Sequence, residues 1–295
     1  MLKLFIVDGY LWIHRSYHAS VQAGLTSEAG EPTGATHIFI TSLLRLLREQ
    51  EPDLLCVAME GGGKTFRHTL SSEYKANRSI PADDFTIQRK RIEEILDAMN
   101  IPMLRVAGFE ADDIIGTVAR YAREDGIDVV ICSKDKDMLQ LVDDGIQVFY
   151  AKTDEYVNVV NVIEKVGVSP DKFIDCLALQ GDAADNILGV PGIGAKTAAK
   201  LINEYGSITN LVKHISELKP KRQEALREHI HRLEVNKMLV TIDCKVPVEI
   251  DYYSFMMDGY DEDKLRDIFV ELGFNQLLIR LGLDEGYKNG TKSTK

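Results

Sequence analysis

Residues 129–137 read VVICSKDKD, a short apolar run that stops at a cluster of charges. Such a run, without alternation of polar and apolar residues, is typical of a strand buried on both faces of a parallel sheet. Residues 2–7 and 54–59 form two similar runs, which also stop at acids, Asp8 and Glu60. The carboxyl ends of parallel strands meet at one edge of a sheet, where ligands of α/β proteins bind. We therefore expect these acids to gather at one site.

Amphipathic stretches separate the apolar runs. Apolar residues recur at spacings of three and four over 36–49, 86–100 and 111–123, which predicts helices. Strands that alternate with helices predict an α/β fold with a parallel twisted sheet flanked by helices.

After about residue 168 the sequence changes in character to helices and turns. Helices are expected over 173–180, 221–239 and 262–281. We therefore expect an α/β domain over 1–167 and a helical C-terminal region over 168–295.

The composition is that of a globular protein, with 295 residues, 45% apolar and 27% charged. No apolar run approaches the ~20 residues that a membrane span needs, and Asp8 interrupts the N-terminal run before a secretory signal could form. A cytoplasmic protein is expected. The four cysteines are widely spaced and predict neither a disulfide framework nor a zinc site.

Nine carboxylates occupy strand ends, helix starts and turns. An acid at any one such position is as readily a turn former or a helix cap. Two bare carboxylates ~6 Å apart repel by about 3 kcal/mol at an effective dielectric of ~20, so a group of them needs cations. Oxygen ligands without nearby His or Cys favour Mg²⁺ or Mn²⁺, and so many acids favour two or more ions. The nine are Asp8, Glu60, Glu110, Asp112, Asp113, Asp135, Asp137, Asp182 and Asp185.

The net charge of −11 at first argues against a nucleic-acid partner, but without these nine acids it would be −2. Residues 64–91 hold seven Lys or Arg against three acids, and residues 190–232 hold eight against four. Solvated helix faces explain either run, whereas a track for a polyanion explains both.

Residues 189–198 read GVPGIGAKTA, a glycine-rich turn before a helix. Glycines allow close backbone approach, so the amides at the helix start and the side chains of Lys196 and Lys200 are suited to grip a phosphate backbone. A dinucleotide site is the competing interpretation, and it fails because no strand precedes the turn.

Six segments together resemble the 5′ nuclease family, which includes the 5′→3′ exonuclease domain of bacterial DNA polymerase I, stand-alone phage 5′ nucleases and flap endonucleases. They are DGYLWIHRSYHA (8–19), GEPTGA (30–35), GKTFRHTLSSEYKANRS (63–79), GFEADDIIGT (108–117), SKDKDMLQL (133–141) and GDAADNILGVPGIGAKTA (181–198). The resemblance runs nearly end to end and implies a PIN-like nuclease domain, followed by a helix-three-turn-helix duplex-binding motif over about 177–205.

The resemblance also assigns the acids to metal sites. Asp8, Glu110 and Asp112 match ligands of a first metal, with Glu60 and Asp113 beside them. Asp135, Asp137, Asp182 and Asp185 match the acids of a second metal. The implied cofactor is Mg²⁺ or Mn²⁺, in two or more ions, with a K⁺ ion at the glycine turn.

Basic and aromatic residues are implied to meet the DNA. Lys75 and Arg78 match a catalytic pair at the base of an arch over about 79–100, which in the family draws the scissile phosphate to the metals. The DNA contacts implied by the matching segments are Arg15, His14, Lys64, Arg67, Tyr74, Arg89, Lys90, Arg91, Gly192, Gly194, Lys196, Thr197 and Lys200.

Three positions depart from the family pattern. Glu60 replaces Asp, Lys134 replaces Gly and so places a cation between acid groups, and His14 replaces a stacking Tyr. We interpret them as tuning the site, because the other acids are present.

The expected function is hydrolysis of a phosphodiester near the 5′ end of flapped, nicked or branched DNA, in replication, repair or primer removal. The reaction leaves a 5′-phosphate and a 3′-hydroxyl. The enzyme is expected to be a monomer, and RNA–DNA primer junctions are a further expected substrate. Two alternatives stay open: a catalytically weakened protein that binds branched DNA, and a PIN-like RNase.

Overall fold

The computed structural model describes residues 2–78 and 82–284, and the chain separates into two compact units. The β1 unit comprises the described residues of 2–59, 80–104 and 249–295, and the β4 unit comprises 60–79 and 105–248. Both units cross the boundary at 167/168 that the sequence suggests. The β1 unit does so because the segment after residue 248 returns to pack on its helices.

The β1 unit contains three parallel strands, β1 (Lys3–Asp8), β2 (Leu54–Ala58) and β3 (Met103–Leu104), with β2 in the middle. All of β2, and β1 from Leu4 onward, is buried. Burial of both faces explains why these strands lack polar alternation. The register pairs Asp8 with Ala58, so Asp8 stands at the carboxyl end of β1.

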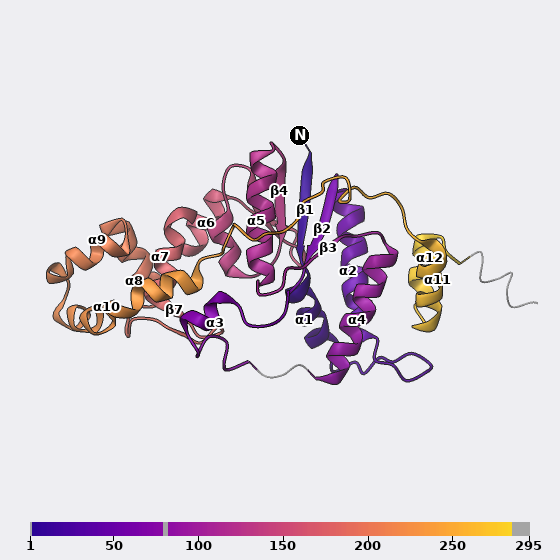
Figure 1. Cartoon of the computed structure of the whole chain (residues 1–295), viewed down its shortest axis with the longest axis horizontal. Coiled ribbons are helices and arrows are strands. Elements are labelled where there is room, and N and C mark those ends of the chain that lie inside the picture. The colour runs from indigo at the N-terminus through magenta and orange to yellow at the C-terminus, as the bar shows by residue number, and fades with distance from the viewer. Residues whose placement is uncertain (1, 79–81, 285–295) are drawn as a thin grey trace, which may run out of the picture. The chain divides into compact units, whose positions relative to one another are not determined.

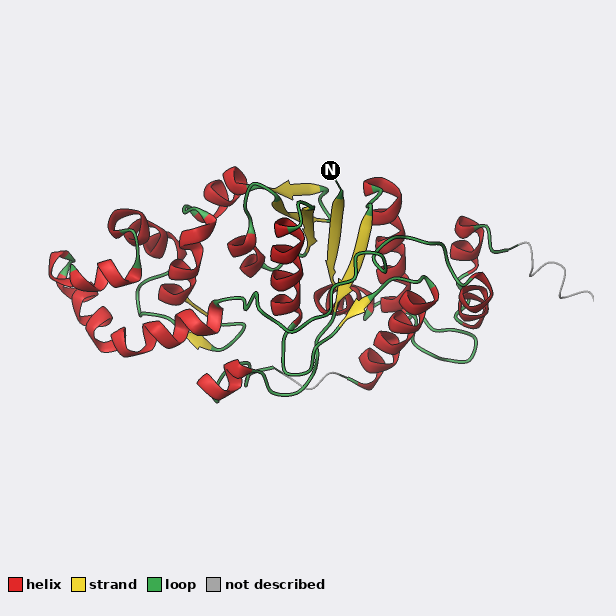
Figure 2. Ribbon diagram, turned by 45° about the horizontal axis from the view of Figure 1, so that its top comes forward, coloured by secondary structure: helices red, strands yellow, loops and turns green. Residues whose placement is uncertain are grey.

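Five helices accompany these strands among the described residues (Figures 1 and 2). They are α1 (Gly9–Ser20), α2 (Gly34–Gln50), α4 (Asp83–Ala98), α11 (Glu262–Glu271) and α12 (Asn275–Leu281). The single helix expected over 262–281 is wrong, because the chain breaks between α11 and α12. Gly273, at φ +73, makes this break in the left-handed region that glycine favours.

The arch expected over about 79–100 stays a prediction. Residues 79–81 lie outside the described residues, and the remainder is mainly α4, which packs on α2. Phe85, Gln88 and Ile92 are buried on the packed face, and the Gln88 Oε1 accepts a hydrogen bond from the Ala35 amide at 2.7 Å. The apolar spacing that predicted a helix therefore serves this packing.

The β4 unit contains parallel strands β4 (Asp128–Cys132) and β5 (Ile146–Tyr150), and β6 (Glu155–Val157) joins β5 in antiparallel pairing. The helix α5 (Ala111–Glu124) precedes β4, and the 3₁₀ helix η1 (Lys136–Leu141) follows it. The chain therefore passes directly from the end of β4 to the acids Asp135 and Asp137.

The remainder of the β4 unit is helical, as expected after residue 168 (Figure 1). It packs α7 on both α8 and α10, and a short hairpin of β7 and β8 follows α7. The bounds are α3 (Phe66–Leu70), α6 (Val159–Val166), α7 (Pro170–Gln180), β7 (Gly181–Asp182), β8 (Ile187–Leu188), α8 (Ala195–Tyr205), α9 (Ile208–Lys213), η2 (Ile215–Glu217) and α10 (Pro220–Val240).

The cysteines are free thiols, as the sequence predicted, and three of the four are buried. Burial raises the pKa of Cys176 to about 12, as expected of an unreactive thiol. Over the described parts of the chain, no helix has both the length and the hydropathy that crossing a membrane requires.

Candidate active site

Glu110 is the N-cap of α5, and its side chain is 6% exposed. The Lys75 Nζ lies 2.8 Å from its Oε2, and the Tyr74 hydroxyl lies 3.1 Å from the same oxygen. A buried carboxylate requires such partners, because burial without them is unfavourable by several kcal/mol.

Asp185, in the loop between β7 and β8, shares these partners. The Tyr74 hydroxyl is 3.1 Å and the Lys75 Nζ is 3.8 Å from its Oδ2, while the Arg78 Nη2 donates to Oδ1 at 2.7 Å. Tyr74 and Lys75 therefore each bridge the carboxylates of Glu110 and Asp185.

The backbone of Lys75 explains how two successive side chains reach the same carboxylates. Successive side chains of an extended segment point to opposite sides. Lys75 instead has φ 53, a left-handed conformation uncommon for a residue with a side chain, and its amide donates to the Asp185 carbonyl at 3.0 Å. Segment 73–78 is thus tied to the acidic loop 182–186 by this main-chain hydrogen bond.

The charges of this group support one another. Burial by itself lowers the pKa of Lys75, but the Glu110 and Asp185 carboxylates outweigh it and the net direction is upward. Burial and the same carboxylates raise the pKa of Tyr74. Lys75 therefore stays charged and Tyr74 keeps its proton, so that both donate hydrogen bonds.

A second group of acids follows β4. The Asp135 side chain caps η1 by accepting from the Asp137 amide at 2.8 Å, and the Lys136 Nζ lies 2.9 Å from the Asp182 Oδ2. Burial first, and then the charges of Asp135, Asp182 and Asp185, raise the pKa of Asp137 to about 8. This group has too little positive charge for its carboxylates.

These acids fit divalent cations by their chemistry. The Asp137 Oδ1 is buried and has no hydrogen-bond partner among the described residues, and the raised pKa of Asp137 signals a missing positive charge. All donors are carboxylate oxygens, which Mg²⁺ and Mn²⁺ prefer. Within residues 2–78 and 82–284, no three His, Cys, Asp or Glu side chains are grouped tightly enough to hold an ion as they stand. Instead, Lys75, Arg78 and Lys136 form ion pairs with the carboxylates of Glu110, Asp185 and Asp182.

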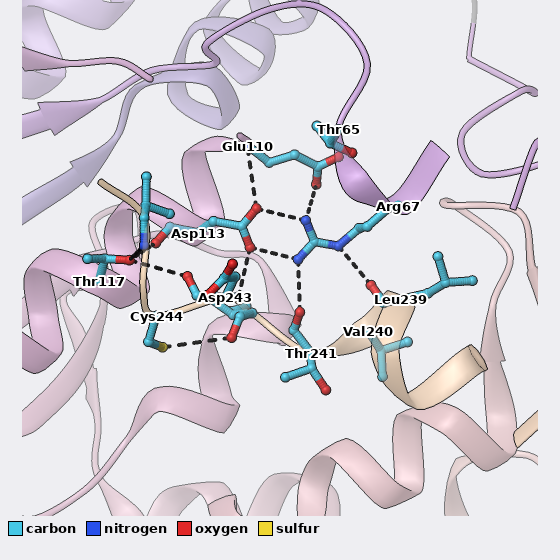
Figure 3. A network of polar contacts seen from close by, with 12 residues as sticks. Thr65, Arg67, Glu110, Asp113, Thr117, Leu239, Val240, Thr241, Asp243 and Cys244 are labelled. Carbon is cyan, nitrogen blue, oxygen red and sulfur yellow. Dashed lines mark hydrogen bonds and ion pairs between the residues drawn. The ribbon is translucent and has the colours of Figure 1, made fainter. Parts of the chain in front are cut away.

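Asp113, predicted as a metal ligand, and Arg67, predicted as a DNA contact, lie together in the interior of the β4 unit. Asp113 is fully buried, and the Arg67 guanidinium donates to both of its carboxylate oxygens at 2.7 Å (Figure 3). Arg67 is itself only 3% exposed. The fork fixes the direction of both side chains as well as neutralising their charges.

Tyr74, Lys134 and Arg91 have the following partners within the fold. Tyr74 is 3% exposed, and its hydroxyl donates to the Glu110 Oε2. The Lys134 Nζ lies 5.2 Å from the Tyr150 ring centroid, whereas Lys136, which sequence reasoning missed, pairs with an acid. Arg91 forms ion pairs within the β1 unit, to Glu31, Glu94 and Glu271.

The remaining predicted ligands lie as follows. The Gly61 amide donates to the Phe109 carbonyl at 3.3 Å, which brings the segments of Glu60 and Glu110 side by side. The negative charge of Asp112 acts on Lys75. Asp8 belongs to the β1 unit, where its Oδ1 accepts from the Leu11 amide at 3.0 Å.

Several predicted DNA contacts are exposed. Lys196 and Lys200 project from the first half of α8, and Gly192, at φ +77, makes the preceding turn. Also exposed are Arg15, Lys64, Lys90 and Gly194, while His14, Arg89 and Thr197 are half-buried. His14 packs at 4.5 Å between ring centroids from both Tyr10 and Phe85.

Curated relatives of similar sequence are bacterial DNA polymerases I. The chain is 37% identical over 287 residues to that of Bacillus subtilis, covering 96% of this chain and 32% of the relative. It is 36% identical over 286 residues to that of Thermus aquaticus, covering 97% and 34%. The chain therefore spans about a third of the length of these relatives.

Solved structures share the fold. The T5 D15 protein co-crystallized with metal ions aligns with a TM-score of 0.70 at 22% identity, covering 94% of this chain and 99% of that chain. The catalytic core of Rad2 in complex with DNA substrate aligns with a TM-score of 0.62 at 18% identity, covering 95% and 92%.

Two family models match consecutive parts of the chain. Residues 3–167 match the N-terminal resolvase-like domain of 5′-3′ exonucleases, and residues 168–263 match the C-terminal SAM fold of the same enzymes. With acids, bridging cations and both domains in one chain, this protein belongs to the 5′-3′ exonuclease family.

Proposed function

We propose that this chain is a structure-specific 5′ nuclease, which hydrolyses a phosphodiester near the 5′ end of flapped, nicked or branched DNA. The observation that carries the proposal is the bridge of Lys75 between Glu110 and Asp185, with Arg78 beside it. Lys75 and Arg78 lie beside the carboxylates that match metal ligands of the family. A scissile phosphate would need both the metal ions and these basic side chains at this place.

Two sets of acids would hold the divalent ions, with Mg²⁺ or Mn²⁺ as the proposed cofactor. Glu60, Glu110 and Asp112 form one set, to which the resemblance alone adds Asp8. The other set is Asp135, Asp137, Asp182 and Asp185. When bound, the ions supply Lewis-acid stabilisation of phosphate charge and make water a better nucleophile at neutral pH.

Lys75 and Arg78 would change partners during the reaction. With divalent ions held by these acids, Glu110 and Asp185 would hold the two basic side chains less strongly. Lys75 and Arg78 would donate to the non-bridging oxygens of the phosphate, where negative charge develops. Tyr74, which cannot leave its buried position as readily, would keep the two carboxylates at a fixed separation.

The glycine turn and α8 would hold the duplex part of the substrate. Gly192 and Gly194 are exposed, and Lys196 and Lys200 lie within two turns of the start of α8. Exposed amides and lysines contact phosphates without reading bases. The chain would therefore bind duplex DNA independently of its sequence. A K⁺ ion is proposed to bind at the same turn.

The test is a cleavage assay on a DNA duplex that carries a labelled 5′ flap, with Mg²⁺ or Mn²⁺ and with EDTA as the control. We expect metal-dependent cutting near the junction that leaves a 5′-phosphate and a 3′-hydroxyl. The matched control is Asp185→Asn, which should bind the same junction without cutting it.

Each rival predicts another outcome of that assay. Tight junction binding without cleavage by the wild-type chain would identify a binding protein, and preference for an RNA flap over a DNA flap would identify an RNase. Light scattering during gel filtration, with and without the junction, tests the proposed monomer.

A further inference from the structure

Arg67 is the centre of a buried polar network in the β4 unit (Figure 3). Its Nη1 and Nη2 donate to the two carboxylate oxygens of Asp113 at 2.7 Å. Its Nε donates to the Leu239 carbonyl at 2.9 Å, and Nη2 also donates to the Thr241 carbonyl at 2.8 Å. The side chain therefore joins α5 to the last turn of α10 and the residue that follows it.

Asp113 has its acceptor capacity filled by protein. Besides Arg67, its Oδ1 accepts from the Asp243 amide at 2.8 Å, and its Oδ2 lies 3.4 Å from the Glu110 amide. The residue is fully buried. A carboxylate offers about four lone-pair sites, and four donors already lie against these oxygens.

The segment after α10 is fitted closely to α5. A Cβ on Gly116 would lie 2.6 Å from the Ile242 Cγ2, so this approach requires glycine. Thr117 adds a polar link, because its Oγ1 donates to the Asp113 carbonyl at 2.8 Å and accepts from the Val246 amide at 3.0 Å. These contacts thus fix the first turns of α5 relative to the end of α10.

The same first turn carries Glu110. The Arg67 Nη1 lies 3.7 Å from the Glu110 Oε2, the oxygen that Lys75 and Tyr74 also approach. The guanidinium therefore approaches this carboxylate from one more direction, and Asp113 keeps the guanidinium in place. Arginine suits this role, because its planar fork fixes direction as well as charge.

We propose that Arg67 and Asp113 are a pair of positioning residues: they fix the Glu110 carboxylate against the end of α10, and Asp113 binds no metal. This inference rests on the proposed function, because Glu110 is useful in this position only if it serves a metal-dependent nuclease. Arg67 and Asp113 do not touch the substrate in this proposal.

The experiment compares Arg67→Lys, Asp113→Asn and the double variant Arg67→Met/Asp113→Leu with the wild type. The double variant removes both charges together, which avoids an unpaired buried charge and is often tolerated by folded proteins. Arg120→Met is the matched control, because it removes another arginine of α5, whose ion pair with Asp143 is partly exposed. Circular dichroism selects the variants that fold.

Two quantities are measured on the folded variants. The first is the number of Mn²⁺ ions bound without DNA, from electron paramagnetic resonance titration. The second is single-turnover cleavage of the flap substrate at saturating metal. We expect every variant to bind as many ions as the wild type. Cleavage should fall about 10²-fold in the pair variants, the loss typical of a misplaced group, and should be unchanged in Arg120→Met.

The double variant should lose no more activity than the worse single variant, because both changes break one contact. An ion count lower by one in Asp113→Asn or in the double variant, but not in Arg67→Lys, would show that Asp113 is a ligand and overturn the proposal. Full cleavage by the folded double variant would reduce the pair to a folding role. Absence of cleavage by the wild type would instead refute the proposed function, and the ion counts would still decide the role of Asp113.

Discussion

Asp113 and Asp137 are two acids of the β4 unit with opposite surroundings. Asp113 is fully buried and receives a guanidinium fork of its own. Asp137 stands among three other acids, has a buried Oδ1 without a described partner, and its pKa is raised to about 8 by burial and by those acids. The first environment is complete, whereas the second lacks positive charge.

The difference separates an acid whose charge is neutralised within the fold from acids that the proposed function assigns to divalent ions. A carboxylate whose counter-ion is part of the same fold contributes to one fixed structure. Carboxylates that share too few cations are unfavourable in the empty state, and a divalent ion relieves that strain when it binds. Variants of Arg67 or Asp113 should therefore lose activity because Glu110 is misplaced. Variants of the crowded acids should lose activity because metal ions bind less well.

The largest expected effect comes from Asp185→Asn and Asp112→Asn. Each removes a negative charge from a proposed metal set, so cleavage of a 5′ flap should fall by about 10³-fold or more. Binding of the junction should remain, because the exposed lysines are untouched. Stopped-flow cleavage and a gel-shift titration measure both, and near-normal turnover in the two variants would refute the two-metal assignment.

Lys75→Ala should have the next largest effect. The variant loses the cation that bridges Glu110 and Asp185, and turnover should fall about 10²-fold, with a smaller change in affinity. Comparing kcat with the dissociation constant for the junction separates the two. A change confined to affinity would make Lys75 a tether for DNA.

Tyr74→Phe sharpens the comparison with an almost isosteric change. It deletes the hydroxyl that links Glu110 to Asp185. Hydrogen bonds to charged groups contribute about 1.5–3 kcal/mol, and the lower end of this range corresponds to roughly 10-fold slower cleavage. The control is Tyr121→Phe, on the exposed surface of α5. Equal activity of the two variants would argue against a role for the bridge.

Asp137 should make the stability of the metal-free protein depend on pH. Its pKa is raised in the folded state, from an ordinary 3.8 to about 8, so folding favours its protonated form. The stabilisation is present at low pH and is lost as the pH rises through this window. The Tm of the wild type in EDTA should therefore fall relative to Asp137→Asn between pH 5 and about 8. Excess Mg²⁺ should remove the difference, and parallel Tm curves in EDTA would contradict the prediction.

The smallest effect on chemistry is expected from Lys196→Ala and Lys200→Ala. Their exposed charges lie outside both acidic environments, so cleavage at saturating substrate should be nearly unchanged. Duplex affinity should decrease equally for all sequences, and the slope of log K against log salt should become shallower by about 1 per lysine. Fluorescence anisotropy at several salt concentrations measures this, and a loss limited to some sequences would contradict it.

The fold followed from the sequence where local patterns were strong. The apolar runs at 2–7, 54–59 and 129–132 are strands, and the predicted helices at 36–49 and 111–123 are present. The helix predicted over 262–281 is two helices. The apolar periodicity continues across Gly273, but the positive φ of this glycine ends the first helix. Amphipathic spacing over 86–100 likewise identifies α4 as a helix without showing that its apolar face packs on α2.

In the site, residue type alone did not separate neighbours with different roles. Asp112 and Asp113 are adjacent and chemically identical, yet one acts on Lys75 and the other holds Arg67. Lys134 and Lys136 both alternate with acids, yet the Lys136 Nζ pairs with Asp182 whereas the Lys134 Nζ lies over the Tyr150 ring. The DKD pattern contained the signal for Lys136, but its orientation depends on η1.

The sequence by itself determined the strand–helix alternation, the carboxylates and glycine turn, and the family, because these depend on local periodicity and on motifs in a fixed order. Tertiary structure decided which acids receive a cation from the fold and which are left crowded. That assignment depends on residues distant in sequence, as Arg67 meets Asp113 and Thr241, and Lys75 meets Glu110 and Asp185. The energy of a charge depends on its burial and its partners in space, and no linear pattern contains them.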